Sequence, residues 1–364
     1  MSAPDHRAFP LMAICGSPPL NSKIHILRNR KIPLEAEEWY RDRIKRFKEK
    51  VCLASDIGIC EGPIISAHTL SVGAMLRPIS RNGHVYTLSA DRYAESYDDV
   101  IQLKLTGIRA TSVFNGFCAK HDKILFSEIE DKPFVCSAEQ NFLHCYRAVA
   151  KESYLKMRQA DIVPSTKEYH QMHRGQNISG HDEFKAGAFK SAYDLEYFKS
   201  KLDRIYESRD FGRIITRVVE FEEQPKIICN SNYLPDFDYE GNVIQDLGDY
   251  SATLQNVSLT IIPSKNGGFA LFSYLDTASK AGDAIFTSLI RQPNITTSII
   301  WMIFCQFENM AISPFWLDSL ENETISMLIK ASRDAANPIL DDLNRLARCP
   351  SYIDDWGVKR IFSL

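Results

Sequence analysis

The sequence has no long apolar run and no strong excess of charge of one sign. Its most apolar stretch, residues 299–305, is far shorter than the roughly 20 residues that cross a bilayer as a helix. The formal net charge of −3 gives no global attraction for nucleic acid, so a phosphate-binding surface would have to be a local patch. The first ten residues lack the apolar core of a secretory signal. These absences predict a cytoplasmic protein with no membrane partner.

Several familiar catalytic motifs are also missing. The chain contains no Gly-x4-Gly-Lys-Ser/Thr loop, no Gly-x-Gly-x-x-Gly turn, no Gly-x-Ser-x-Gly elbow and no His-Glu-x-x-His helix. These absences argue against nucleotide hydrolysis, dinucleotide redox chemistry, serine hydrolysis and zincin proteolysis, in that order. The 9 cysteines are an odd number and too sparse for a disulfide scaffold, which fits a reducing compartment.

Cysteine and histidine are nevertheless spaced as metal ligands in one region. Cys52 and Cys60 precede the pair Cys118 and His121, and four such ligands suit one tetrahedral zinc. The Cys-x2-His pair has zinc-knuckle spacing, whereas the first pair is separated by more residues than the usual two to four. We therefore predict a structural Zn²⁺ bound by these four residues. The alternative is that they are ordinary buried thiols.

Two further residues stand near these ligands in a suggestive order. His68 ends the apolar-led segment Ile-Ile-Ser-Ala-His, and Asn115 comes just before the second pair. With the knuckle, this order resembles the HNH-type (treble-clef, ββα-metal) nucleases over about residues 52–122. The resemblance implies that His68 is the general base toward water, that Asn115 orients or completes the site, and that Mg²⁺ or Mn²⁺ stabilises the scissile phosphate. His84, from the long insertion after His68, is either a second metal ligand, a catalytic partner of His68, or a packed turn residue.

A basic stretch with helical periodicity, residues 34–50, leads into the zinc ligands. This stretch has two interpretations. It is either a solvated helix or a helix that holds the backbone of DNA or RNA through three cations: Arg41, Lys45 and Lys48.

Composition divides the chain into an N-terminal arm (1–34), a zinc-knuckle HNH-like domain with helices (35–160), a linker (161–181) and a C-terminal domain (182–364). The zinc-knuckle domain should end in a long helix over residues 136–160. We expect its buried stripe to contain Phe142, Tyr146 and Val149, and its cations to lie outside that stripe: Arg147, Lys151, Lys156 and Arg158.

The C-terminal domain places strands before helices, without the alternation that a parallel sheet requires. A strand over 214–221 and a hairpin over 257–272, turning at Asn-Gly-Gly, precede apolar helices over 281–290 and 296–307. The fold class is therefore α+β, with a small, mostly antiparallel sheet covered by the C-terminal helices. We expect four of its apolar side chains to be buried: Leu271, Phe272, Trp301 and Phe304.

Two functions follow from these patterns. The first is a metal-dependent endonuclease that hydrolyses phosphodiester bonds. The second is a non-catalytic, zinc-stabilised adaptor or sensor that binds nucleic acid or a partner protein, as in bacterial defence, with the C-terminal domain serving recognition or homo-oligomer formation. The surroundings of His68 discriminate between them. An exposed imidazole beside a carboxylate or second histidine in a basic cleft favours the enzyme, and a buried imidazole hydrogen-bonded to backbone favours the adaptor.

Overall fold

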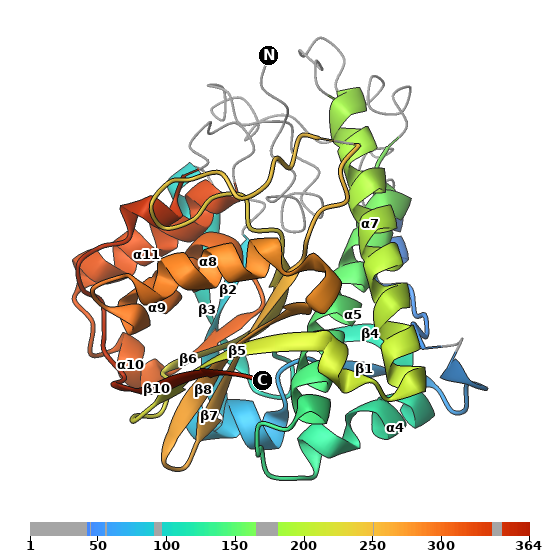
Figure 1. The fold of residues 1–364 in the computed structure, drawn as a ribbon, viewed down its shortest axis with the longest axis horizontal. Helices are drawn as coiled ribbons and strands as arrows, with labels where there is room; N and C mark the ends of the chain where they lie inside the picture. The colour runs from blue at the N-terminus through green and yellow to red at the C-terminus, as the bar shows by residue number, and fades with distance from the viewer. Residues whose placement is uncertain are drawn as a thin grey trace.

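An antiparallel sheet runs through the middle of the molecule (Figure 1). The computed structural model describes residues 42–43, 45–54, 57–90, 97–164, 181–249, 251–336 and 344–364. The sheet has 8 strands in the order β10-β5-β8-β7-β6-β9-β2-β3. Their bounds are β2 His84–Ala90, β3 Ile101–Gly107, β5 Ile214–Phe221, β6 Ile227–Tyr233, β7 Val257–Ser264, β8 Gly267–Leu275, β9 Met310–Ile312 and β10 Val358–Ser363.

The predicted hairpin is confirmed as β7 and β8, which pair from Ser258↔Ser273 to Ser264↔Gly267. Its tight turn requires glycine at the start of β8. Gly267 has φ +121°, and a Cβ there would lie 2.0 Å from the carbonyl oxygen of Phe221 on the neighbouring strand β5. Only a residue without a side chain fits such an approach.

Helices cover both faces of the sheet, and β6 is accordingly buried at every position. On one face α5 (Ala138–Ile162) crosses the strands, and α7 (His181–Ser208) packs against α5 (Figure 1). The other face carries α8 (Lys280–Ile290), α9 (Ile295–Gln306) and α11 (Asn322–Ala335). The predicted burial of the four C-terminal apolar side chains is confirmed, at 0% exposure for Leu271 and Phe272, 2% for Phe304 and 8% for Trp301.

Short elements connect these layers. They are the π-helix η3 (Val72–Leu76), α3 (Arg77–Ile79), α10 (Pro314–Leu317) and the 3-10 turns η4 (Tyr97–Asp99), η5 (Phe211–Arg213), η6 (Asp276–Ala278) and η7 (Leu346–Arg348).

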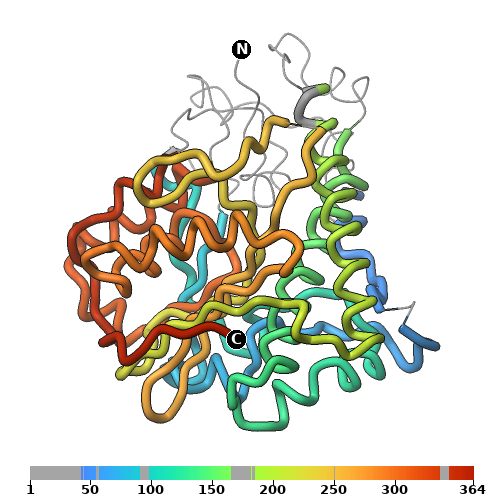
Figure 2. The backbone as a smooth tube through the Cα atoms, viewed as in Figure 1, coloured from blue at the N-terminus to red at the C-terminus, as the bar shows by residue number. Residues whose placement is uncertain are grey.

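The sheet is larger than the small one expected, because strands from before and after the predicted strand region join it. The strands β2 and β3 come from the insertion after His68, and β2 meets β9 at the pair Tyr86↔Ile312. The C-terminal strand β10 pairs with β5 along the opposite edge (Figure 2). Packing therefore crosses the boundary between the two expected domains, since β2 and β3 belong to the same sheet as the C-terminal strands.

The prediction that the cations of α5 lie outside its buried stripe is wrong for three of the four. The exposed fraction is 1% for Arg147 and 8% for Lys156 and Arg158, because α7, the sheet and residues 113–130 surround the helix. Arg147 donates to Glu130 at 2.7 Å and lies 4.0 Å over the Phe126 ring. These partners replace the water that a buried guanidinium loses.

Candidate metal centre

The four candidate metal ligands gather around a separate two-stranded antiparallel sheet, the β1–β4 sheet, of β1 (Ile64–His68) and β4 (Val113–Cys118), which is followed by α4 (Ala119–Glu130). Cys118 is the N-cap of α4, and its sulfur accepts the backbone N–H of His121 at 3.5 Å. The segment before β1 is tied to β4, since Val51 N donates to Asn115 O at 3.1 Å and Leu53 N donates to Gly116 O at 2.9 Å. The β1–β4 sheet and the start of α4 thus bring both ligand pairs together.

The four predicted ligands form one cluster, with all ligand atoms within 4.8 Å of one another. The Nδ1 atom of His121 lies 3.3 Å from the sulfur of Cys52, 3.6 Å from that of Cys60 and 3.4 Å from that of Cys118. A tetrahedral zinc with Zn–S bonds of about 2.3 Å and a Zn–N bond of about 2.0 Å separates sulfur from nitrogen by about 3.5 Å. The three distances therefore fit a single zinc-sized centre with His121 bound through Nδ1.

Burial sets the protonation of these groups when no metal is bound. It raises the pKa of the Cys52 thiol to about 11, and it lowers the pKa of His121, so the imidazole is neutral near pH 7. Burial also tends to raise the pKa of Cys118, but hydrogen bonds from the backbone N–H groups of His121 and Glu61 turn the net shift downward. A metal would have to displace the remaining thiol protons, so its binding should weaken in acid.

An aromatic core lies beneath the cluster. Phe117 on β4 and Phe126 on α4 pack edge to face, with ring centroids 5.2 Å apart, and both are 0% exposed. The same apolar cluster includes Tyr146 of α5 and Leu202 of α7. The β1–β4 sheet and α4 are thereby fixed to the body of the protein.

His68, the expected general base, is half-buried at the end of β1. Its Nε2 lies 3.1 Å from the carbonyl oxygen of Arg109, so this nitrogen carries the proton and donates. Burial lowers the pKa of the imidazole, against smaller effects of the Arg109 hydrogen bond and of Glu130. No carboxylate or second histidine hydrogen-bonds to this ring among the residues that the structure describes.

The other expected site residues lie apart or make local contacts. Asn115 donates to the carbonyl of Lys48 at 3.3 Å and accepts from Ser66 at 3.4 Å. His84 begins β2 in the large sheet, so it does not belong to the β1–β4 sheet. Its Nδ1 lies 2.9 Å from the carbonyl oxygen of Asn82. Lys45 and Lys48 are exposed, and Arg41 lies outside the described residues.

Sequence reasoning missed a second group of polar residues around a cavity between α5, α7 and the end of β6. Lys151 and Asn309 meet there at 2.5 Å. A lysine within the otherwise buried middle of α5 was the available signal, but helical periodicity alone placed it on an exposed face.

No other cluster of three or more Cys, His, Asp or Glu ligand atoms occurs in the described part of the chain. Among the helices of these residues, none has the length and apolarity needed to cross a membrane. Comparisons with protein-family models, with curated proteins and with solved structures found no match for this chain.

Proposed function

We propose that this protein is a zinc-stabilised, non-catalytic binding protein whose Cys52, Cys60, Cys118 and His121 hold one structural Zn²⁺, with nucleic acid as its partner. The observation that carries the proposal is the completeness of the ligand set. Four side chains at tetrahedral spacing leave no coordination position for water or substrate, which is typical of structural zinc sites; catalytic sites keep one position open.

The environment of His68 supports a structural role for that residue too. Its Nε2 proton is committed to the Arg109 carbonyl, and the orienting carboxylate that a general base usually has is not hydrogen-bonded to it among the described residues. The imidazole therefore ties the end of β1 to the Arg109 turn.

Metal content tests the zinc part of the proposal. We expect about one zinc per chain in the wild type. Cys118→Ser should lose the metal and much of its thermal stability, because zinc-binding energy is also folding energy. Cys136→Ser is the matched control, since the Cys136 thiol contacts Asn141 and lies outside the cluster. Equal zinc content in Cys118→Ser and the wild type would overturn the assignment.

Nucleic-acid binding rests on the exposed cations at the entry to the zinc region. Lys45 and Lys48 are both exposed, and neither forms an ion pair within the described residues. Replacing both with glutamate should weaken binding of short DNA or RNA duplexes about tenfold or more and lower the salt dependence by about two phosphate contacts. Lys330→Glu on α11 is the control, because Lys330 already pairs with Asp334. If the Lys45/Lys48 double variant and Lys330→Glu both bind the duplexes as the wild type does, or if the wild type itself does not bind them, the proposed nucleic-acid partner is wrong. A protein partner is then proposed instead.

The HNH-type nuclease is the second candidate, and one observation favours it. Ser66 donates to Asn115 at 3.4 Å across the β1–β4 pair, and Ser66 and His68 are two residues apart on β1, so His68 and Asn115 lie on the same side of it. Plasmid cleavage with Mg²⁺ or Mn²⁺ is the test, with His68→Ala as the inactive variant and His84→Ala as the control. General-base loss typically costs about 10²–10⁴-fold in rate. We expect no cleavage by the wild type, and cleavage that only His68→Ala abolishes would establish the nuclease instead.

A further inference from the structure

A cavity of about 340 Å³ lies away from the zinc cluster, between α5, α7 and the segment that follows β6. This volume is within the range of small-molecule sites. Its lining includes the polar side chains of Lys151, Asn256 and Asn309 and the apolar side chains of Leu155, Leu254 and Phe307. It also includes four carboxylate residues, Glu152, Asp194, Asp249 and Glu308. A lining with both polar and apolar side chains suits a ligand with one polar end and a hydrocarbon body.

Asn309 holds Lys151 in the lining of the cavity. Its Oδ1 accepts from Lys151 at 2.5 Å and from Ser112 at 2.6 Å, while its Nδ2 donates to the carbonyl of Asn230 at 2.6 Å and to Thr69 at 2.8 Å. All four hydrogen-bonding positions of the amide are used, so its orientation is determined. Lys151 is therefore placed by β6, by the residue after β1 and by the residue before β4 together.

Lys151 differs from the other cavity lysines in having no ion-pair partner among the described residues. Lys190 pairs with Asp194 at 2.5 Å on α7, and Lys156 lies 4.0 Å from Glu152 on α5. Burial lowers the pKa of Lys151 to about 8, against the smaller opposite effects of Glu152 and Glu308. An ammonium in this position retains donor hydrogens that no carboxylate of the described residues accepts.

A second donor faces the same space. The Oδ1 of Asn256 accepts from Asn232 at 2.7 Å. Its Nδ2 has no acceptor among the residues that the structure describes, yet it is not sealed from solvent. Asn256 lines the cavity, so this N–H group is available to a ligand acceptor.

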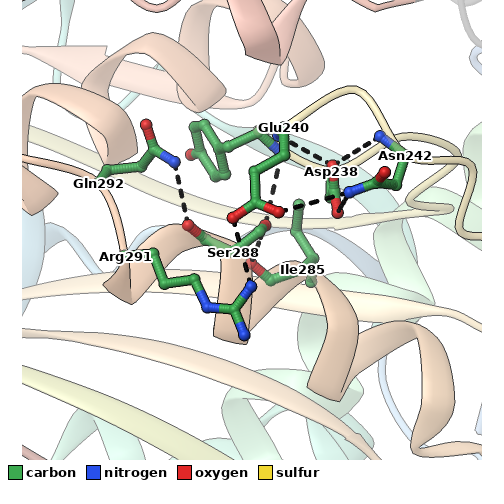
Figure 3. A network of polar contacts seen from close by, with 8 residues as sticks. Asp238, Glu240, Asn242, Ile285, Ser288, Arg291 and Gln292 are labelled. Atoms are coloured by element: carbon green, nitrogen blue, oxygen red, sulfur yellow. Dashed lines mark hydrogen bonds and ion pairs between the residues drawn. The ribbon is translucent and has the colours of Figure 1, made fainter.

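The segment of residues 234–249, which contributes Leu234, Leu247 and Asp249 to the cavity lining, is anchored to α8, as Figure 3 shows. Asp238 accepts from Asn242 Nδ2 at 2.9 Å and closes the turn, and Glu240 pairs with Arg291 at 3.3 Å. The backbone N–H of Tyr239 donates to Ser288 at 3.4 Å. This part of the wall is thus held against the body of the protein, which favours a preformed site.

We propose that this cavity binds a small carboxylate with an apolar body, its carboxylate accepting hydrogen bonds from Lys151 and Asn256 and its hydrocarbon lying against Leu155, Leu254 and Phe307. A carboxylate supplies both the hydrogen-bond acceptor atoms and the negative charge that would pair with the Lys151 ammonium. The site is separate from the zinc cluster, and the proposal does not depend on zinc or on nucleic acid.

Isothermal titration with three probes of the same chain length tests the proposal on the wild type. Octanoate should bind with a dissociation constant on the order of 0.1–1 mM. Octanamide keeps an acceptor without charge and should bind at least about tenfold more weakly, and octylamine should not bind measurably. Octylamine binding as tightly as octanoate, or no saturation by octanoate up to about 10 mM, would overturn the proposal without any variant.

Two matched variants test the role of Lys151. Lys151→Met keeps the apolar stem and removes the charge, so octanoate affinity should fall about tenfold or more. Lys190→Met removes a charge from the same cavity that Asp194 already neutralises, and its affinity should stay within about threefold of the wild type. Circular dichroism checks that both variants fold. Equal loss in the two variants would refute the assigned role of Lys151, and so would no loss in Lys151→Met.

Discussion

Replacing Asn309 by alanine should destabilise the protein by about 1–3 kcal/mol. The estimate comes from the four hydrogen bonds of this amide, at 2.5, 2.6, 2.6 and 2.8 Å. Lys151 can turn to water in the cavity, and the Thr69 and Ser112 hydroxyls keep their hydrogen bond to each other, so these three groups lose little. The Asn230 carbonyl belongs to a residue that is 1% exposed, and a buried group left without its partner costs about 1–3 kcal/mol.

Urea unfolding followed by circular dichroism measures this effect. Asn309→Asp keeps both acceptor contacts and loses both donor contacts, so it should cost less than alanine and remain below the wild type in stability. Asn322→Ala, at the exposed start of α11, is the control and should lie within about 0.5 kcal/mol of the wild type. A change below about 0.5 kcal/mol in Asn309→Ala would refute the reasoning, because it would mean that the buried partners find other acceptors or donors.

Two other predictions concern the edge of the sheet. Gly267→Ala should destabilise the protein by about 2–4 kcal/mol in thermal unfolding, because a Cβ would lie 2.0 Å from the Phe221 carbonyl; retained stability would mean that the turn relaxes. Glu220→Gln should cost up to about 1 kcal/mol near pH 7, because Glu220 pairs with Lys359 and Arg360 of β10. The hydrogen bond from Lys359, with Arg360 adding to it, lowers the folded pKa of Glu220 below its ordinary 4.5, so the stabilisation is present above that pH and disappears as the pH falls through the folded pKa. The difference between wild type and variant in chemical unfolding should shrink on acidification, and a constant difference from pH 7 to about pH 3 would contradict it.

Local patterns in the sequence were enough to predict much of the secondary structure. The turn residues Asn266, Gly267 and Gly268 predicted the hairpin, and apolar periodicity predicted α8 and α9 close to their observed bounds. The Cys-x2-His spacing predicted that Cys118 and His121 act together, because a helix start brings residues three apart to one side. These features depend on neighbours in the chain, so the chain alone reveals them.

The burial of side chains on α5 could not be predicted from local patterns. The sequence predicted the helix itself, but not that Arg147 and Lys156 would be enclosed, since burial depends on which distant elements cover a face. The insertion after His68 likewise gave a strand signal at β2, while its place beside β9 depends on pairing with residues more than 200 positions away. Short strands such as β9 carry too few residues to show a period.

The sequence by itself identified four candidate metal ligands and those helices and strands that have a clear period, because spacing and periodicity express local geometry. Only the tertiary structure decided that the ligand atoms converge to within 4.8 Å, that His68 donates to a backbone carbonyl, and that Lys151 and Asn256 face one cavity. The physical reason is that each of these contacts joins segments distant in the chain. These contacts depend on how the 8-stranded sheet, α5 and the β1–β4 sheet pack together, and no local pattern encodes that packing.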